Sequence, residues 1–478
     1  MDNYDLCFMS ARDIVSMIAD KQVSAKEVTE AVLERIELVE PKINSYITVC
    51  ADVALAEAEA ADRIQASGNT LGPLHGVPIG VKDLLNTKGV KTTFASHVFA
   101  DNVPDTDCVS IARLREAGAI LVGKTTTPEF GHKPMTEAKL FGETRNPWDL
   151  NRTSGGSSGG AGAAAAAGLA PLHVGTDAGG SIRIPAAACG VVGMKQTLGL
   201  VPHDMKADTF GLFSYIGPLT RTVSDAGLLL SVMGGRHYSD VHSLNCPAVD
   251  GLAKDALGEG DLNKVKIGWR LFLGNETIDP ETQELFEKAL LVFSELGAEL
   301  IPCDGPFTPT LPIWEPITFS AFATRYGELI ERFGDKITET LRYWSGKGAN
   351  FSSVDLQNAI HHRTKIFREV QCWFQEIDLL VTPTLTRPAI DLHHDPRDPI
   401  EIEGQLLDEP RASWYPYTHP FNMSGHPAIT VPSGWTTDGL PVGLQIVGPW
   451  MGDGSVLNAA ACFEKARPWV GKHPILDS

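Results

Sequence analysis

Gly155-Gly-Ser-Ser-Gly-Gly160 and Gly175-Thr-Asp-Ala-Gly-Gly-Ser-Ile-Arg-Ile-Pro185 are the two stretches that decide how this chain folds and what it does. Glycine tolerates positive φ angles and close backbone approach, so each stretch can hold a serine tightly against another segment. Between them runs a segment rich in alanine and glycine, from Gly160 to Ala170. It is too short and too weakly hydrophobic to cross a membrane, which predicts a buried helix.

The second stretch predicts an anion-binding backbone loop. The N–H groups of Ala178, Gly179, Gly180 and Ser181 can converge on one oxygen, which would place an oxyanion hole beside a serine hydroxyl. Asp177 and Arg183 flank this loop, and we expect them to form a buried ion pair that braces it.

The first stretch allows three interpretations from its residues alone. A plain flexible glycine loop is one. A phosphate-binding loop is disfavoured because no Gly-Lys-Ser/Thr follows the glycines. Gly155-x-Ser157-x-Gly159 also matches the nucleophile elbow of α/β-hydrolases, which requires a hydrophobic strand directly before it. Residues 146–154 are polar and rich in turn formers, so we expect no strand there and no elbow.

Lys82 is the third candidate for chemistry. It follows Gly76-Val-Pro-Ile-Gly-Val81, which predicts a short buried strand. Lysines are usually solvated surface residues. At the end of a buried strand, however, a lysine loses hydration, its pKa falls, and the neutral amine can take a proton from a serine.

Together these segments resemble the amidase signature family. The two serines lie 24 positions apart, as the family pattern requires. Further matching segments extend the resemblance over most of the chain: Gly123-Lys-Thr125, Asn146-Pro-Trp148, Asp378-Leu-Leu-Val-Thr-Pro383, Asn422-Met-Ser-Gly-His-Pro-Ala-Ile429 and Gly439-Leu-Pro-Val-Gly-Leu-Gln445.

The resemblance implies a role for each residue. Ser181 corresponds to the nucleophile, Ser157 to a proton-passing serine preceded by a cis peptide bond, and Lys82 to the base. The N–H groups of residues 178–181 correspond to the oxyanion hole. Four residues are expected to support the site: Ser158, Thr176, Asp177 and Arg183. No metal or cofactor is implied.

The expected fold is an α/β amidase-signature fold, with a large twisted mixed β-sheet between layers of helices. We expect one domain over residues 1–478, with a signature core at about 60–230 and a helical, aromatic-rich insertion at about 310–420. Capping-box patterns predict helix starts at Ser10 and Ser24.

The family acts on amides, and some members cleave esters or carbamates. Aromatic residues in the loop 203–215 and in the insertion favour an apolar or aryl substrate. The residues expected to contact it are Gly131, Met135, Phe210, Phe213 and Tyr215, with further wall residues at Trp314, Phe319, Phe322 and 414–417.

Composition limits the partners. The net charge of −19 disfavours nucleic acid, and the acidic residues are scattered along the chain. Eight widely spaced cysteines without Cys-x-x-Cys pairs favour neither a zinc site nor a disulfide framework, so we expect a reducing cytoplasm. The acidic stretch Met1–Asp5 does not resemble a signal peptide. We expect a small-molecule substrate, no membrane partner, and a monomer or homodimer.

Three rival functions remain open. The chain could be the A subunit of glutamyl-tRNA amidotransferase, a glutaminase within a complex, although Ile184 stands where that subgroup usually has glutamine. It could be a catalytically silent scaffold, although all three catalytic residues are present. It could also be a histidine-triad hydrolase that uses His419 or His426.

Overall fold

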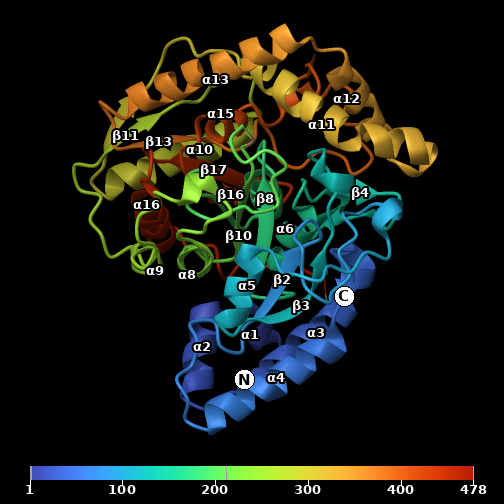
Figure 1. The fold of residues 1–478 in the computed structure, drawn as a ribbon. Helices are drawn as coiled ribbons and strands as arrows, with labels where there is room; N and C mark the ends of the chain where they lie inside the picture. Colours follow the sequence, from blue (N-terminus) through green and yellow to red (C-terminus); the bar gives the residue numbers. More distant parts are fainter. Residues whose placement is uncertain (1–2, 212, 477–478) are drawn as a thin grey trace.

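The centre of the molecule is an 11-stranded mixed β-sheet (Figure 1). The computed structural model describes residues 3–211 and 213–476. In spatial order the strands are β1 (Tyr46–Val49), β3 (Ile120–Thr125), β2 (Pro78–Lys82), β8 (Leu172–Asp177), β10 (Tyr215–Thr220), β9 (Val192–Lys195), β16 (Ala428–Trp435), β17 (Pro441–Val447), β13 (Leu379–Pro383), β11 (Lys266–Trp269) and β12 (Glu299–Pro302). Strand β2 runs parallel to β3 and β8, and β11 runs parallel to β12 and β13. The remaining neighbours are antiparallel, so the predicted mixed sheet is confirmed.

Helices flank this sheet. One group, α6 (Gly159–Ala166) and α7 (Arg183–Cys189), packs on the central strands. Another group, α8 (Val223–Met233), α9 (Leu252–Asp255), α10 (Pro280–Glu295) and α16 (Asp453–Ala466), packs together and contacts strands β10 and β16. Every residue of α6 is buried, as its alanine and glycine content predicted.

The two ends of the molecule are helical (Figure 1). The N-terminal end holds α1 (Asn3–Phe8), α2 (Ala11–Ala19), α3 (Ala25–Ile43) and α4 (Ala51–Ala66), with α5 (Val109–Glu116) close to the sheet. At the opposite end, α11 (Leu311–Phe333), α12 (Glu339–Ala349) and α13 (Ser353–Trp373) form an arch, and the short α15 (His419–Ser424) lies beneath it. Another short helix, α14 (Pro410–Ser413), precedes α15 in the chain. Ser10 caps α2 and Ser24 forms a complete capping box on α3, as predicted.

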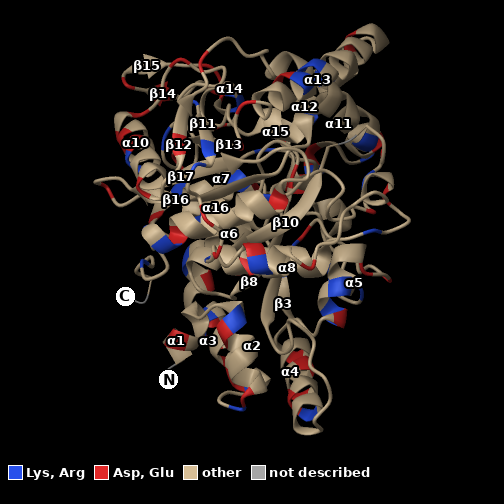
Figure 2. Ribbon diagram, turned by 90° about the vertical axis from the view of Figure 1, so that its left-hand side faces the viewer, with Lys and Arg blue, Asp and Glu red and all other residues tan. Residues whose placement is uncertain are grey.

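Part of the expected insertion belongs to the main sheet. Residues 311–373 are mainly helical, as predicted. Strand β13, however, falls within the range 310–420 and pairs with both β17 and β11. None of the helices in the described part of the chain is both long and apolar enough to span a membrane. Figure 2 shows acidic and basic residues spread over many helices of the surface, in keeping with their scatter along the sequence.

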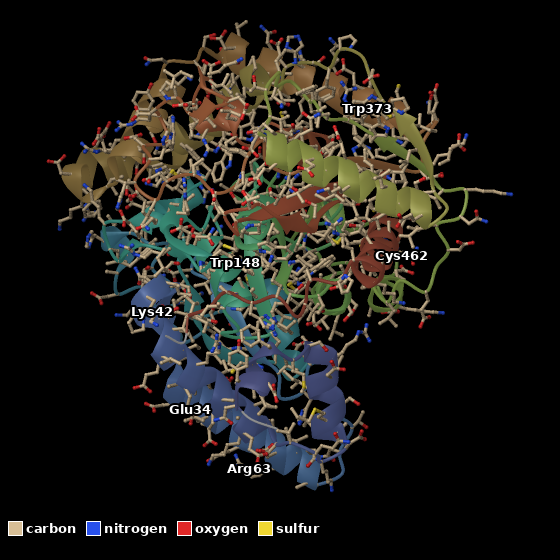
Figure 3. The ribbon with its side chains drawn as sticks, turned by 180° about the vertical axis from the view of Figure 1, so that it is seen from behind. Glu34, Lys42, Arg63, Trp148, Trp373 and Cys462 are labelled. Carbon is tan, nitrogen blue, oxygen red and sulfur yellow. The ribbon has the colours of Figure 1, made fainter. Side chains whose placement is uncertain are left out.

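The prediction that residues 146–154 contain no strand is wrong. Strand β7 (Asp149–Thr153) pairs with β6 (Arg145–Asn146) in a separate two-stranded hairpin. Its sequence is polar, which explains why hydrophobic alternation did not reveal it. Trp148, at the turn of this hairpin, is labelled in Figure 3. Because the hairpin lies outside the main sheet, the nucleophile-elbow context is still absent.

Candidate active site

Lys82 is the last residue of β2, between β3 and β8 in the sheet. Its side chain is fully buried. The amine Nζ lies 2.7 Å from Ser157 Oγ, 2.8 Å from Ser158 Oγ and 3.0 Å from Thr176 Oγ1. Three hydroxyl groups from two other segments therefore surround one amine.

The three hydroxyls can form different hydrogen bonds with the amine of Lys82: some accept from it and one can donate to it. Ser158 Oγ donates to the carbonyl of Thr176 at 3.1 Å, so it accepts from Lys82. A neutral amine has two N–H groups and one lone pair. If the N–H groups point at Ser158 and Thr176, the lone pair faces the hydroxyl of Ser157.

Burial lowers the pKa of Lys82 well below its ordinary value. The charge of Asp177 acts in the opposite direction but is the smaller influence. Burial thus favours the uncharged form of this amine, which can accept a proton.

Ser157 and Ser181 stand on adjacent loops. Ser157 follows a cis peptide bond from Gly156 and precedes α6, whereas Ser181 precedes α7. The N–H of Ser158 donates to the carbonyl of Ser181 at 3.1 Å, which ties the loops together. Both serines line one cavity of about 200 Å³, where Ser157 is buried and Ser181 is half-buried.

The predicted ion pair of Asp177 and Arg183 is present and fully buried, with Arg183 Nε 3.1 Å from Asp177 Oδ2. Burial alone would raise the pKa of Asp177, but Arg183 and further hydrogen-bond donors hold it below its ordinary value. The guanidinium also donates to the carbonyl of Thr418, to Gln445 Oε1 and to Asn422 Oδ1. The loop that carries Ser181 is therefore anchored to the C-terminal part of the chain.

The four amides predicted to form the oxyanion hole are not equivalent. The Gly180 N–H donates to Asp177 Oδ1 at 2.7 Å. The N–H groups of Ala178, Gly179 and Ser181 have no acceptor within residues 3–211 and 213–476. These three amides belong to residues that line the cavity.

Two side chains that the sequence did not connect to this loop hold its carbonyls. Trp314 Nε1 donates to the carbonyl of Ala178 at 3.1 Å, and Thr418 Oγ1 donates to that of Gly179 at 2.7 Å. Trp314 was expected only as a wall residue. The long sequence separation of these contacts left no local signal for them.

The cavity wall agrees with the predicted substrate contacts only in part. Gly131 and Phe213 line the cavity. Met135 and Tyr215 are instead buried outside it, the Tyr215 hydroxyl donating to the carbonyl of Asn422 at 2.7 Å. Phe210 is 78% exposed and lines a neighbouring groove. The aromatic residues on the wall are Phe94, Phe130, Phe213, Trp314, Phe322, Tyr326 and Tyr415.

No histidine ring in the described part of the chain hydrogen-bonds to either serine. Burial lowers the pKa of both His419 and His426 to about 3. His426 Nε2 lies 2.8 Å from Gln371 Oε1, and His419 packs near Trp314 and Tyr415. The geometry gives no support to a histidine triad. The described residues also contain no cluster of three His, Cys, Asp or Glu side chains that could hold a metal.

Comparison with known proteins gives a consistent result. The sequence profile of the Amidase family matches residues 27–457. An acylamidase from Rhodococcus erythropolis is 37% identical, covering 99% of this chain and 98% of that protein. The A subunit of glutamyl-tRNA(Gln) amidotransferase from Cyanothece sp. is 35% identical, covering 98% of this chain and all of that protein.

The solved structures point the same way. A bacterial aryl acylamidase superposes with a TM-score of 0.91 at 31% identity, covering 98% of this chain and 99% of that one. The A subunit of glutamyl-tRNA(Gln) amidotransferase from Thermotoga maritima superposes with a TM-score of 0.73 at 30% identity, covering 93% and 92%. The chain therefore belongs to the amidase signature family of amide-hydrolysing enzymes.

Proposed function

We propose that this enzyme is an acylamidase that cleaves aryl or hydrophobic amides through an acyl-enzyme on Ser181. The observation that carries the proposal is the fully buried amine of Lys82, which lies 2.7 Å from Ser157 Oγ, while Ser157 and Ser181 line one cavity together. A neutral amine beside a relay hydroxyl supplies the base that serine needs.

In the first half-reaction, Lys82 takes the proton of Ser157, which takes that of Ser181. The Ser181 oxygen attacks the carbonyl carbon, and the N–H groups of Ala178, Gly179 and Ser181 receive the negative oxygen. When the C–N bond breaks, Ser157 protonates the leaving amine and recovers a proton from Lys82. Water then replaces the amine and releases the acid by the same relay.

The wall supports an aromatic substrate. A dry cavity of about 150 Å³ is large enough to hold one benzene ring. This cavity, at about 200 Å³, therefore suits one ring with a short acyl group. Phe130 stacks on Tyr326 with centroids 4.5 Å apart, which gives the ring an aromatic face to pack on. Esters and carbamates of the same size are expected substrates because they present the same carbonyl.

The test is amine release from a panel of anilides, primary amides, aryl esters and aryl carbamates, with a fluorophosphonate probe to locate the nucleophile. We expect anilide turnover and one covalent adduct on Ser181, lost in Ser181→Ala. An adduct on another residue would contradict the mechanism. A protein that neither turns over nor reacts would be the scaffold that the sequence left open.

The second candidate is glutaminase activity within a tRNA amidotransferase, because the relative from Cyanothece sp. is 35% identical over its whole length. Free glutamine carries an ammonium group as well as a carboxylate, and no Asp or Glu among the described residues lines the cavity to pair with the ammonium. The lack of a partner for this ammonium favours the acylamidase. Glutamine hydrolysis that appears only with a partner protein would favour the alternative.

A further inference from the structure

The described part of the cavity wall contains cationic side chains and lacks carboxylates, although the protein as a whole is acidic. Its lining includes Lys133, Lys206, Arg325 and Arg411 and, of the residues that the structure describes, no carboxylate. The whole chain carries a net charge of −19. A one-sided set of charges around a substrate site selects for the opposite charge on the ligand.

Two of these cations are already committed to partners. Lys133 forms an ion pair with Glu137. Arg411 pairs with Glu409 at 3.0 Å, and its guanidinium stacks on Trp344, 4.5 Å from the ring centroid. Their charges are locally compensated, so they are not free to bind a substrate.

The amine of Lys206 has unused hydrogen-bonding capacity. Its side chain is 2% exposed, and its amine is 3.3 Å from Asp240 Oδ2. The amine nevertheless has no hydrogen-bond partner in the described part of the chain. Asp240 Oδ2 already accepts from the N–H of His203 at 3.0 Å. A buried ammonium with unused N–H groups is costly and gains from an additional acceptor.

Arg325 has no carboxylate partner within residues 3–211 and 213–476. It is exposed on α11, and its guanidinium lies over the ring of Tyr326, 5.3 Å from the centroid. It lines both the cavity and the neighbouring groove, so it stands at the mouth. Lys82, by contrast, is fully buried and does not line the cavity.

Arg325 and Lys206 line the same cavity, and His203 is a third residue of its wall. Burial lowers the pKa of His203 most; Lys206 lowers it further, Asp240 raises it, and Arg325 lowers it with a smaller effect. An anion in this cavity therefore meets both cations on its wall.

We propose that Arg325 and Lys206 bind a carboxylate of the substrate, away from the bond that is cleaved. This inference rests on the proposed function and narrows it to aryl amides that carry an anionic group. The aromatic wall holds the ring, and the planar guanidinium of Arg325 pairs with the carboxylate at the mouth.

The experiment compares kcat/KM for neutral acetanilide with two anionic analogues. 4-Acetamidobenzoate carries the carboxylate on the leaving amine, and succinanilate carries it on the acyl group. We expect at least one anion to exceed acetanilide by about 10- to 100-fold, the size typical of a charge-assisted hydrogen bond. Arg325→Gln should reduce this ratio to near one, chiefly through KM, and Lys206→Gln should reduce it partly.

A matched control is available on the same helix. Arg332 is exposed and lies over the ring of Phe333, 5.0 Å from the centroid, but does not line the cavity. Arg332→Gln should leave the ratio unchanged. Arg325→Glu should favour a cationic analogue, 4-acetamidobenzylamine.

The outcomes separate this inference from the proposed function. If acetanilide is cleaved and neither anion is preferred, or if Arg325→Gln leaves the preference intact, the inference is overturned while the acylamidase stands. If Ser181 reacts with the probe but none of these anilides is cleaved, the acylamidase proposal itself fails.

Discussion

Lys82 and Lys195 are both fully buried, and burial lowers the pKa of each well below its ordinary value, yet their surroundings differ. Lys82 faces three hydroxyl groups. Lys195 faces the carbonyls of Gln196 at 2.9 Å and His426 at 2.6 Å, and lies over the ring of Tyr215 at 4.0 Å.

The difference explains why Lys82, and not Lys195, is proposed as the base, although both are buried. A hydroxyl can donate a proton as well as accept one, so the amine of Lys82 can take a proton from Ser157. Carbonyls and an aromatic face only accept, so the surroundings of Lys195 can hold N–H groups but offer no proton to transfer. Lys195 is therefore a structural crosslink between strand β9 and the loop after α15.

The largest expected effect is on catalysis at the first lysine. Lys82→Met keeps the length and volume of the side chain but removes the base, so kcat/KM should fall by at least about 1,000-fold. Steady-state kinetics on the best anilide would measure this, with the thermal melting temperature as the check on folding. A folded Lys82→Met variant that keeps more than a tenth of the activity would mean that Lys82 is not the base and does not differ from Lys195 in this respect.

The pH profile gives the next effect. In the proposed mechanism only the neutral form of Lys82 is active, so kcat/KM should fall about tenfold per pH unit once the pH drops below its lowered pKa, and should be flat above it. Asp177 stays ionised in this range because its pKa is held low. A rate that rises towards acid would contradict the base assignment.

The lowered pKa of Lys82 also makes the stability of the protein depend on pH. Between its lowered pKa and about 10.4, Lys82 binds fewer protons in the folded protein than in the unfolded chain, so its contribution to stability increases with pH. Chemical unfolding of the parent and of Lys82→Met at several pH values would show a smaller alkaline gain in the variant.

Lys195→Met should show the opposite pattern from Lys82→Met. It leaves the carbonyls of Gln196 and His426 without a donor, at about 1–3 kcal/mol for each group left unsatisfied. The free energy of unfolding in urea should fall accordingly, while kcat/KM of the folded enzyme changes by less than about tenfold. Full stability with lost turnover would mean that Lys195 also serves the chemistry.

The smallest effect concerns the loop beside Ser181. Trp314→Phe keeps an aromatic ring but loses the hydrogen bond to the carbonyl of Ala178, worth about 1 kcal/mol. We expect kcat to fall about fivefold. Trp148→Phe is the matched control, since Trp148 Nε1 donates at 2.7 Å to the carbonyl of Cys189, whose side chain does not line the cavity. Equal losses in both variants would mean that the effect is general rather than local.

Much of the fold could be predicted from the sequence because local residue patterns indicate its helices and strands. The apolar run before Lys82 gave β2, the small-residue run gave the buried α6, and the acidic residue after Ser24 gave the start of α3. The polar strand β7 was missed because it lies outside the core and has no hydrophobic alternation.

Part of the candidate site was also predictable from the sequence. The ion pair of Asp177 and Arg183 joins residues 6 positions apart, so one motif predicts it. Lys82 and Ser157 are 75 positions apart, and their grouping was implied by the family resemblance. The direction of an aromatic side chain depends on tertiary packing, so Phe210 and Tyr215 were assigned to the wall although they lie outside it. The carbonyl contact of Thr418 lies 239 positions from its partner, beyond any local pattern.

The bond between Trp314 and Ala178 also has a consequence for engineering. Helix α11 carries both Trp314, which donates to the carbonyl of Ala178, and Arg325, whose guanidinium lies over the ring of Tyr326. Libraries built at Trp314 should therefore change turnover and selectivity together. Libraries built at Arg325 offer a way to redirect substrate choice while the reaction centre is left as it is.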